Sequence, residues 1–292
     1  MGHRWAASII LSLGFGAVLE LIRNFIPLPF LASYRMAFHR GPDGLFLGDL
    51  ELAYPVLPPI LPAWAVTLIM SIFPVTVLCA TQPFVRSGWD FMAAWNGIGL
   101  AGAIFSYVCA FCKLFVLTPK STFLSICRPV QPMMDALWHA VPEYERTSRI
   151  FFDVSICQGM TSEVTIRGTR YWEIHRALTA FPSGRTVTVW LCAWFLSIYW
   201  NAKLRPFAGR RSTSLWRVLL VFFPLTVAVA MTAIFISQHD TTPLHAFLSA
   251  IIVLPCSVLG YVGNYMGLMD YRPIERGVFS YSGDDGGGEV GV

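Results

Sequence analysis

The sequence predicts an all-α membrane protein whose chain crosses the bilayer six times. Of its 292 residues, 55% are hydrophobic and only 13% are charged, whereas soluble domains carry about 25% charged residues. Six apolar stretches are each long enough to cross a hydrocarbon core of about 30 Å as a helix. They are residues 5–25, 62–82, 90–117, 186–204, 214–236 and 244–268.

The rest of the composition narrows the class of partner. The net charge is +4 and the basic residues are spread over several connections, so no basic tract indicates nucleic acid. No aspartate-rich magnesium motif is present. We therefore expect a lipid partner, no nucleic acid, no metal and no cofactor.

One transmembrane domain is predicted over residues 1–276. The tail 277–292 is rich in glycine and acidic residues, and we expect it to be disordered in the cytoplasm. The third stretch contains small residues that allow close helix contact, which predicts a central position for this helix. These are Gly97, Gly99, Ala101, Gly102 and Ala103.

The short connections predict the orientation. Residues 201–213 carry Lys203, Arg205, Arg210 and Arg211 without an acidic residue, which is typical of a cytoplasmic connection. Six spans then place both termini in the cytoplasm. The connections near 26–61, 118–185 and 237–243 would face the lumen or the outside of an endoplasmic reticulum, vacuolar or plasma membrane.

The outer connections contain further local signals. The first has too many prolines for a continuous helix, and we expect a lid or packing loop. The second contains a short amphipathic pattern at Met133–Ala140. It also contains Cys127 and Cys157, which would pair in an oxidising lumen.

Three polar clusters fall on the same predicted side of the membrane. The first runs from Lys113 to Lys120-Ser121, and the second is Pro182-Ser183-Gly184-Arg185 at the start of the fourth span. A Pro-Ser-Gly turn entering a helix presents N–H groups and a positive dipole end to an anion. The third cluster contains Ser237, Gln238, His245 and Ser249.

This order of clusters resembles the phosphatidic acid phosphatase type 2 family of lipid phosphatases, which includes haloperoxidase-like enzymes. The family pattern is Lys-x6-Arg-Pro, then Pro-Ser-Gly-His, then Ser-Arg-x5-His-x3-Asp at the same span boundaries. Fungal members also have segments similar to Thr122-Phe-Leu-Ser-Ile-Cys127, Leu196-Ser-Ile-Tyr-Trp-Asn-Ala-Lys203-Leu and Asp49-Leu-Glu-Leu-Ala-Tyr54-Pro55. The resemblance covers most of the chain and implies the six-span bundle of that family.

The resemblance also implies catalytic roles, which this sequence retains in part. In the family, the last His attacks phosphorus, its Asp orients that His, and the Pro-Ser-Gly-His residue protonates the leaving group. Here His245 is the nucleophile candidate, one residue farther along than the family spacing, and Ser249 stands at the orienting position. Arg185 replaces the acid His and cannot release a proton near neutral pH.

The phosphate-binding residues implied by the resemblance are altered in a similar way. Lys113, Ser183 and Gly184 match the family pattern, whereas Lys120 and Gln238 replace its two arginines. Lysine keeps the charge but loses the bidentate guanidinium fork. We therefore expect a rebuilt or weakened phosphate site.

Several functions stay open from the sequence. The first is a metal-independent phosphoric monoester or diphosphate hydrolase acting on phosphatidate, diacylglycerol pyrophosphate or a prenyl diphosphate, with weak or lost activity. His175, His239 or Asp240 would then replace the missing acid. The alternatives are a non-catalytic protein that binds lipid or a partner, and an enzyme repurposed for isoprenoid metabolism. A transporter is disfavoured because no inverted repeat is visible.

Overall fold

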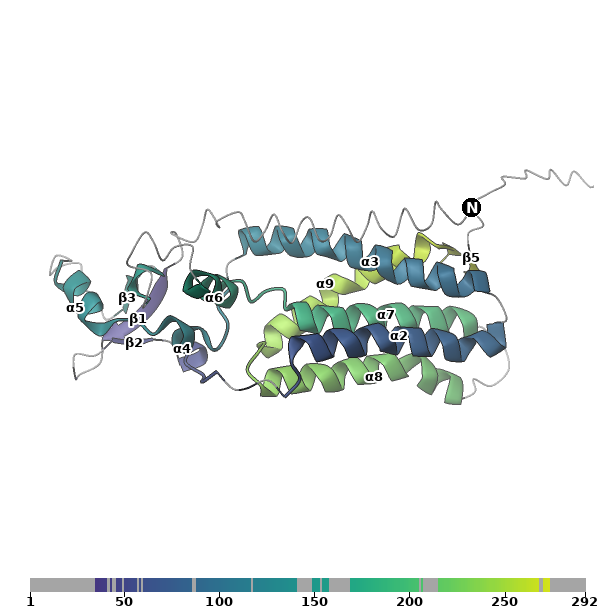
Figure 1. The fold of residues 1–292 in the computed structure, drawn as a ribbon, viewed down its shortest axis with the longest axis horizontal. Helices are drawn as coiled ribbons and strands as arrows, with labels where there is room; N and C mark the ends of the chain where they lie inside the picture. The colour runs from purple at the N-terminus through teal and green to yellow at the C-terminus, as the bar shows by residue number, and fades with distance from the viewer. Residues whose placement is uncertain are drawn as a thin grey trace, which may run out of the picture.

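Long helices lie side by side in the protein (Figure 1). At one end of them lies a smaller layer of short strands and short helices, which we call the outer layer. The computed structural model describes residues 35–40, 43, 46–48, 50–56, 58, 60–85, 88–116, 118–140, 149–152, 154–157, 169–204, 206, 215–267 and 270–273. The predicted first span and the predicted cytoplasmic tail lie outside these residues.

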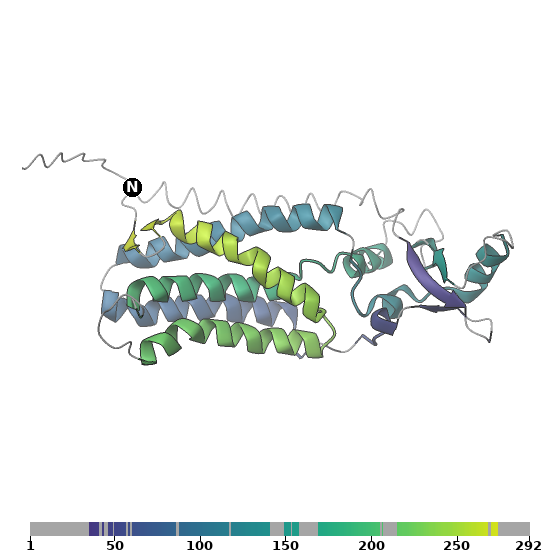
Figure 2. The ribbon, with the colours of Figure 1, turned by 180° about the vertical axis from the view of Figure 1, so that it is seen from behind.

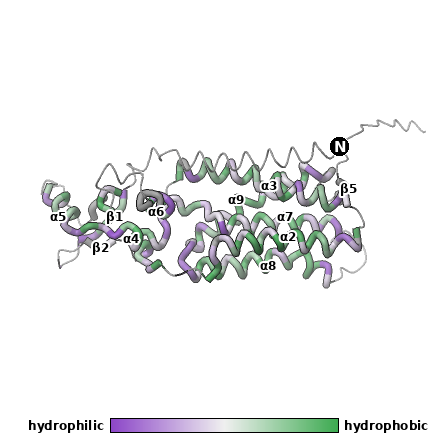
Figure 3. The backbone as a smooth tube through the Cα atoms, in the orientation of Figure 1, coloured by the Kyte–Doolittle hydropathy of each residue, from purple (hydrophilic) through white to green (hydrophobic). Residues whose placement is uncertain are grey.

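Five long helices form the bundle within the described ranges. They are α2 (Ala63–Val85), α3 (Gly88–Phe115), α7 (Gly184–Leu204), α8 (Leu215–Ser237) and α9 (Pro243–Val262). All except α7 are long and apolar enough to cross a membrane. Figure 3 shows hydrophobic residues along these helices and more hydrophilic residues in the outer layer. This is a multi-pass membrane protein with four candidate spans in its described part, and the sixfold crossing stays a prediction.

The central helix of the bundle is α7. It contacts α2, α3, α8 and α9, and its buried residues include Val189, Phe195 and Tyr199. Because protein surrounds it, α7 tolerates polar residues such as Thr186 and Ser197, both buried. This explains why α7 is less apolar than the four candidate spans. The 90–117 stretch, predicted to be central, corresponds to α3, which contacts α2, α7 and α9 among the described helices.

Small residues of α3 do make the predicted close contact, but only over part of the helix. A Cβ atom added to Gly260 of α9 would lie 2.5 Å from the Gly97 carbonyl oxygen and 2.7 Å from Ala101 Cβ. The two backbones therefore touch where α9 runs obliquely past α3 (Figure 2). Gly99 and Gly102 have nothing within 4 Å of an added Cβ.

This contact predicts that substitution by alanine destabilises the protein at Gly260 but not at Gly102. Gly260→Ala forces a methyl group against backbone that cannot move away, so the free energy of unfolding should fall by about 1–3 kcal/mol. Thermal unfolding in detergent, followed by circular dichroism, measures the change. Gly102→Ala is the matched control and should be neutral or slightly stabilising. Equal melting temperatures for both variants would contradict the backbone contact.

A buried ion pair joins the other end of the bundle. Lys203 Nζ lies 2.5 Å from Asp90 Oδ1, and the Tyr199 hydroxyl donates to Asp90 Oδ2 at 2.5 Å. Tyr265 donates to Asp90 Oδ1 at 3.2 Å. Burial, and then the Asp90 charge, raise the pKa of the Tyr265 hydroxyl, which therefore stays a donor. Lys203, which lies in the last turn of α7 where the predicted cytoplasmic connection begins, neutralises a carboxylate that is 1% exposed.

Removing one partner of this pair should be costly, because the remaining charge would stay buried. We expect Lys203→Met to lower the free energy of unfolding by about 3–5 kcal/mol. The Asp90→Asn, Lys203→Met double variant should lose less than the sum of the single variants, as measured by denaturant or thermal unfolding in detergent. Strict additivity would show that the two charges do not stabilise each other.

The last helix ends earlier than the predicted span, which ran to residue 268. The Gly263 N–H closes α9 by donating to the Leu259 carbonyl. The chain then forms strand β4 (Tyr265–Gly267), which pairs antiparallel with β5 (Asp270–Pro273). The fold is thus mostly helical, and the all-α prediction was wrong in these strands.

The outer layer contains a second sheet that was also missed. Strand β1 (Met36–Arg40) pairs antiparallel with both β2 (Phe46–Gly48) and β3 (Arg149–Phe152). The pairing of β1 with β3 joins segments more than 100 residues apart, which local periodicity does not reveal. The first outer connection, expected to be a lid or packing loop, therefore contributes two strands and the short helix η2 (Leu50–Leu52).

Short helices complete the outer layer around a common core. They are α4 (Phe123–Cys127), α5 (Gln131–Ala140), η4 (Val154–Ile156) and α6 (Thr169–Leu178). Helix α5 confirms the amphipathic pattern at Met133–Ala140, and it buries Met134 and Trp138. A disulfide joins Cys127 to Cys157, with the Cα atoms 4.7 Å apart. The layer thus has its own core and a covalent cross-link.

The disulfide can be tested directly. Cys127 and Cys157 should resist alkylation in the denatured, unreduced protein and react only after reduction, because both thiols are already bonded. Peptide mass spectrometry of the two samples measures this. Cys79, an exposed cysteine outside the disulfide, should be alkylated in both. Alkylation of Cys127 without reduction would contradict the pairing.

Candidate functional site

The first two polar clusters are held together by backbone pairing. The chain leaving α3 runs beside the chain that approaches α7, so Lys120 N–H donates to the Ala177 carbonyl at 2.7 Å and Ala180 N–H to the Thr118 carbonyl at 3.0 Å. Phe181 N–H donates to Thr118 Oγ1 at 3.1 Å. This pairing places Lys120 near the start of α7.

The third cluster joins them through the turn between α8 and α9. Ser121 Oγ donates to the His239 carbonyl at 2.7 Å, and the Tyr54 ring stacks on the His239 ring with centroids 4.0 Å apart. Tyr54 N–H donates to the Ser121 carbonyl at 3.1 Å. Parts of all three predicted outer connections thus meet at one end of the bundle, as the shared side of the clusters predicted.

One carboxylate connects two of the cations implied by the sequence pattern. Lys120 Nζ lies 2.9 Å from Asp240 Oδ1, and Arg185 Nη1 lies 3.3 Å from Asp240 Oδ2. We call these three residues the Asp240 cluster. From the sequence, Asp240 was only one of three candidates to replace the missing acid. Its position in the turn, two residues after Gln238, was the available signal that it lies near the predicted phosphate site.

The other predicted phosphate-binding residues are not part of this cluster in the described structure. Lys113 is in the last turn of α3, and within the described chain it makes no ion pair with Asp240. Gly184 is the first residue of α7 and is exposed, and the buried Ser183 Oγ accepts a hydrogen bond from Thr186 at 3.2 Å. Gln238 is buried, and neither amide atom has a hydrogen-bond partner among the described residues.

His245 lies in the first turn of α9. Thr242 caps this helix, and its Oγ1 accepts the His245 N–H at 3.3 Å, as N-cap side chains commonly do. The ring centroid lies 5.6 Å from that of Phe181. Ser249 is fully buried one turn farther on, and its hydroxyl has no hydrogen-bond partner among described groups. Ser249 therefore does not hold the His245 ring in this structure.

A cavity of about 690 Å³ brings two histidines together. His239 and His245 both line it, together with Tyr54, Thr118 and Ser121. His175, another candidate for the missing acid, is 3% exposed in the outer layer and does not line this cavity. Among the three replacement acids that the sequence left open, His239 is the one that shares a cavity with His245.

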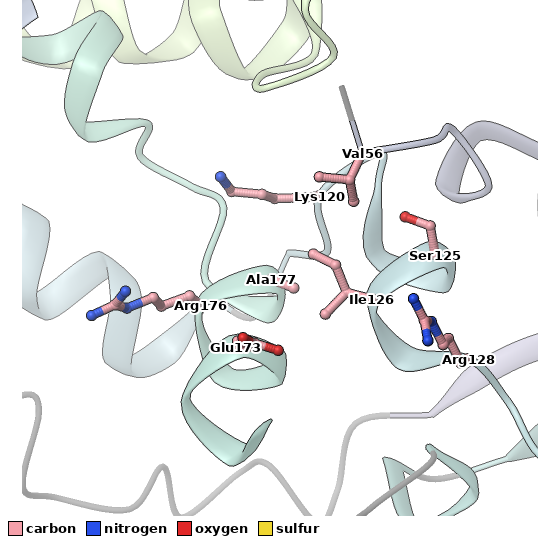
Figure 4. A pocket seen from close by; sticks show the side chains of 8 residues that line it. All are labelled: Val56, Lys120, Ser125, Ile126, Arg128, Glu173, Arg176 and Ala177. Atoms are coloured by element: carbon pink, nitrogen blue, oxygen red, sulfur yellow. The ribbon is translucent and has the colours of Figure 1, made fainter. Parts of the chain in front are cut away.

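A second cavity, of about 450 Å³, also borders Lys120. Its wall also includes Arg128, Arg176 and Glu173. Figure 4 shows the side chains of Lys120 and Arg128 on different sides of Ile126. These cations do not converge on one point, in contrast to Lys120 and Arg185 at Asp240.

Comparison with known proteins identifies two distant relatives. The chain is 26% identical over 230 residues to lipid phosphate phosphatase 2 of Arabidopsis thaliana, covering 77% of this chain and 64% of that protein. It is 26% identical over 165 residues to a PA-phosphatase related-family protein of Dictyostelium discoideum, covering 56% of this chain and 45% of the relative. The chain thus spans less than two thirds of either relative's length.

No family model and no solved structure matches the chain. The names of both relatives agree with the family that the motif order resembles, and four described helices of this chain are long and apolar enough to cross a membrane. The chain is therefore a membrane protein distantly related to lipid phosphate phosphatases.

Proposed function

We propose that this protein binds a phosphorylated lipid at the outer end of its bundle and that its phosphatase turnover is weak or lost. The lipid would be phosphatidate, diacylglycerol pyrophosphate or a prenyl diphosphate. The observation that carries the proposal is the convergence of Lys120 and Arg185 on one anionic group, at 2.9 and 3.3 Å. Two cations from separate segments form the type of cradle that a phosphate needs.

The chemistry of the site supports slow turnover. Arg185 replaces the acid of the family pattern, and loss of a general acid costs about 10²–10⁴ in rate. Ser249 offers no charge to stabilise a His245 imidazolium, unlike the carboxylate of the family pattern. Any residual turnover would use His245 as nucleophile and His239 as acid, because both line the same cavity.

The membrane topology that we propose follows from the charge pattern of the connections between the spans. We propose six spans, cytoplasmic termini and a site on the lumenal or extracellular side. The Cys127–Cys157 disulfide in the outer layer supports this orientation, because disulfides persist in oxidising compartments.

Phosphate release tests the turnover. The purified full chain in detergent, with a chelator present, is assayed with phosphatidate, diacylglycerol pyrophosphate and farnesyl diphosphate. We expect release about 10²–10⁴-fold slower than from a phosphatase with an intact acid, and its loss in His245→Ala. His39→Ala, an exposed histidine of β1, is the matched control. Release unchanged in His245→Ala would exclude the proposed nucleophile.

Binding is measured on the same preparation by calorimetry with dioctanoyl phosphatidate. Replacing Lys120 and Arg185 together by glutamine should weaken binding by at least about tenfold, because charge-assisted hydrogen bonds to the headgroup are lost. Full affinity in this double variant would contradict the proposed cradle.

A further inference from the structure

We propose that Asp240 determines which headgroups enter the phosphate site. Its carboxylate occupies the place between Lys120 and Arg185, where it competes with singly charged phosphodiesters and yields to a terminal phosphomonoester or diphosphate. This inference rests on the proposed function and adds the class of ligand that the site selects.

The contacts make Asp240 an internal stand-in for a bound anion. Each carboxylate oxygen faces a different cation, Oδ1 toward Lys120 and Oδ2 toward Arg185. The side chains of Lys120, Arg185 and Asp240 are 30%, 25% and 19% exposed. The cluster is therefore reachable from outside, and a ligand can replace the carboxylate without unfolding the bundle.

The backbone holds this carboxylate in place. Asp240 N–H donates to the Phe235 carbonyl at 3.1 Å, which closes the end of α8. The preceding residue, His239, has a left-handed backbone with φ of 54° and is fixed by Ser121 and Tyr54. Because it is tethered, the carboxylate is present at the cations at a high effective concentration.

Charge decides which ligand displaces it. A phosphodiester carries one negative charge, the same as the carboxylate, and must also overcome the tether. A terminal phosphate carries about −1.5 to −2 at pH 7, so it interacts more strongly with two cations. The surface of a membrane consists largely of phosphodiester headgroups, and a cradle without Asp240 would be filled by them. Such exclusion of the wrong partner is a common source of specificity.

Calorimetry on the full chain in detergent tests the inference with two soluble lipids. Dioctanoyl phosphatidylglycerol represents phosphodiesters, and dioctanoyl phosphatidate represents terminal phosphates. We expect Asp240→Asn to bind the phosphatidylglycerol roughly 3–10-fold more tightly, as the loss of partly exposed ion pairs implies. The gain for phosphatidate should be smaller, so that the preference for phosphatidate falls.

Two further variants complete the design. Asp135→Asn removes the same charge from α5, outside the Asp240 cluster, and should leave the preference unchanged. Asp240→Glu keeps the carboxylate and should retain most of the preference. If Asp240→Asn does not fold, Asp240→Ser takes its place in the comparison.

The outcomes separate the two proposals. An unchanged preference in Asp240→Asn, with wild-type protein still binding phosphatidate through Lys120 and Arg185, overturns the role of Asp240 and leaves the binding function standing. A lower melting temperature with an unchanged preference identifies Asp240 as a structural ion-pair partner and also overturns it. Failure of both wild type and Asp240→Asn to bind phosphatidate contradicts the proposed function itself.

Discussion

The pairing of the segment after α3 with the segment before α7 is the constraint on which the outer end of the protein depends. Thr118 and Phe181 are 63 residues apart in the chain, yet they are hydrogen-bonded neighbours. The described residues between them contribute, together with strand β1, to a buried core and carry a disulfide, which offset the entropy lost on closing so long a loop. Lys120 reaches Asp240 because this loop is closed.

The sequence located most of the bundle but little of the outer layer, for a physical reason. Apolar runs depend on local composition, so the stretch 62–82 appears as Ala63–Val85 and 214–236 as Leu215–Ser237. Strand β1 exists because Met36 pairs with Phe152, and no local pattern encodes that partner. The central place of α7 was also hidden, because a helix surrounded by protein needs less hydropathy than one facing lipid.

The candidate site could be predicted at the level of segments. Motif order indicated that the three clusters share one end of the bundle, and the contacts of Ser121 with His239 agree. The pairing of Asp240 with two cations could not be predicted, because it depends on the left-handed backbone of the preceding residue. A single sequence does not show which residue of a turn adopts that conformation.

The close approach of Gly97 and Gly260 restricts which residues the α3–α9 crossing can hold. A Cβ atom added to Gly260 would lie 2.5 Å from the Gly97 carbonyl oxygen, so any larger residue there would push the two helices apart. The same helix carries His245 in its first turn, fifteen residues from Gly260, or roughly 22 Å at the rise of an α-helix. The glycine thus fixes the position of the helix that carries His245, although it does not line the cavity of that histidine.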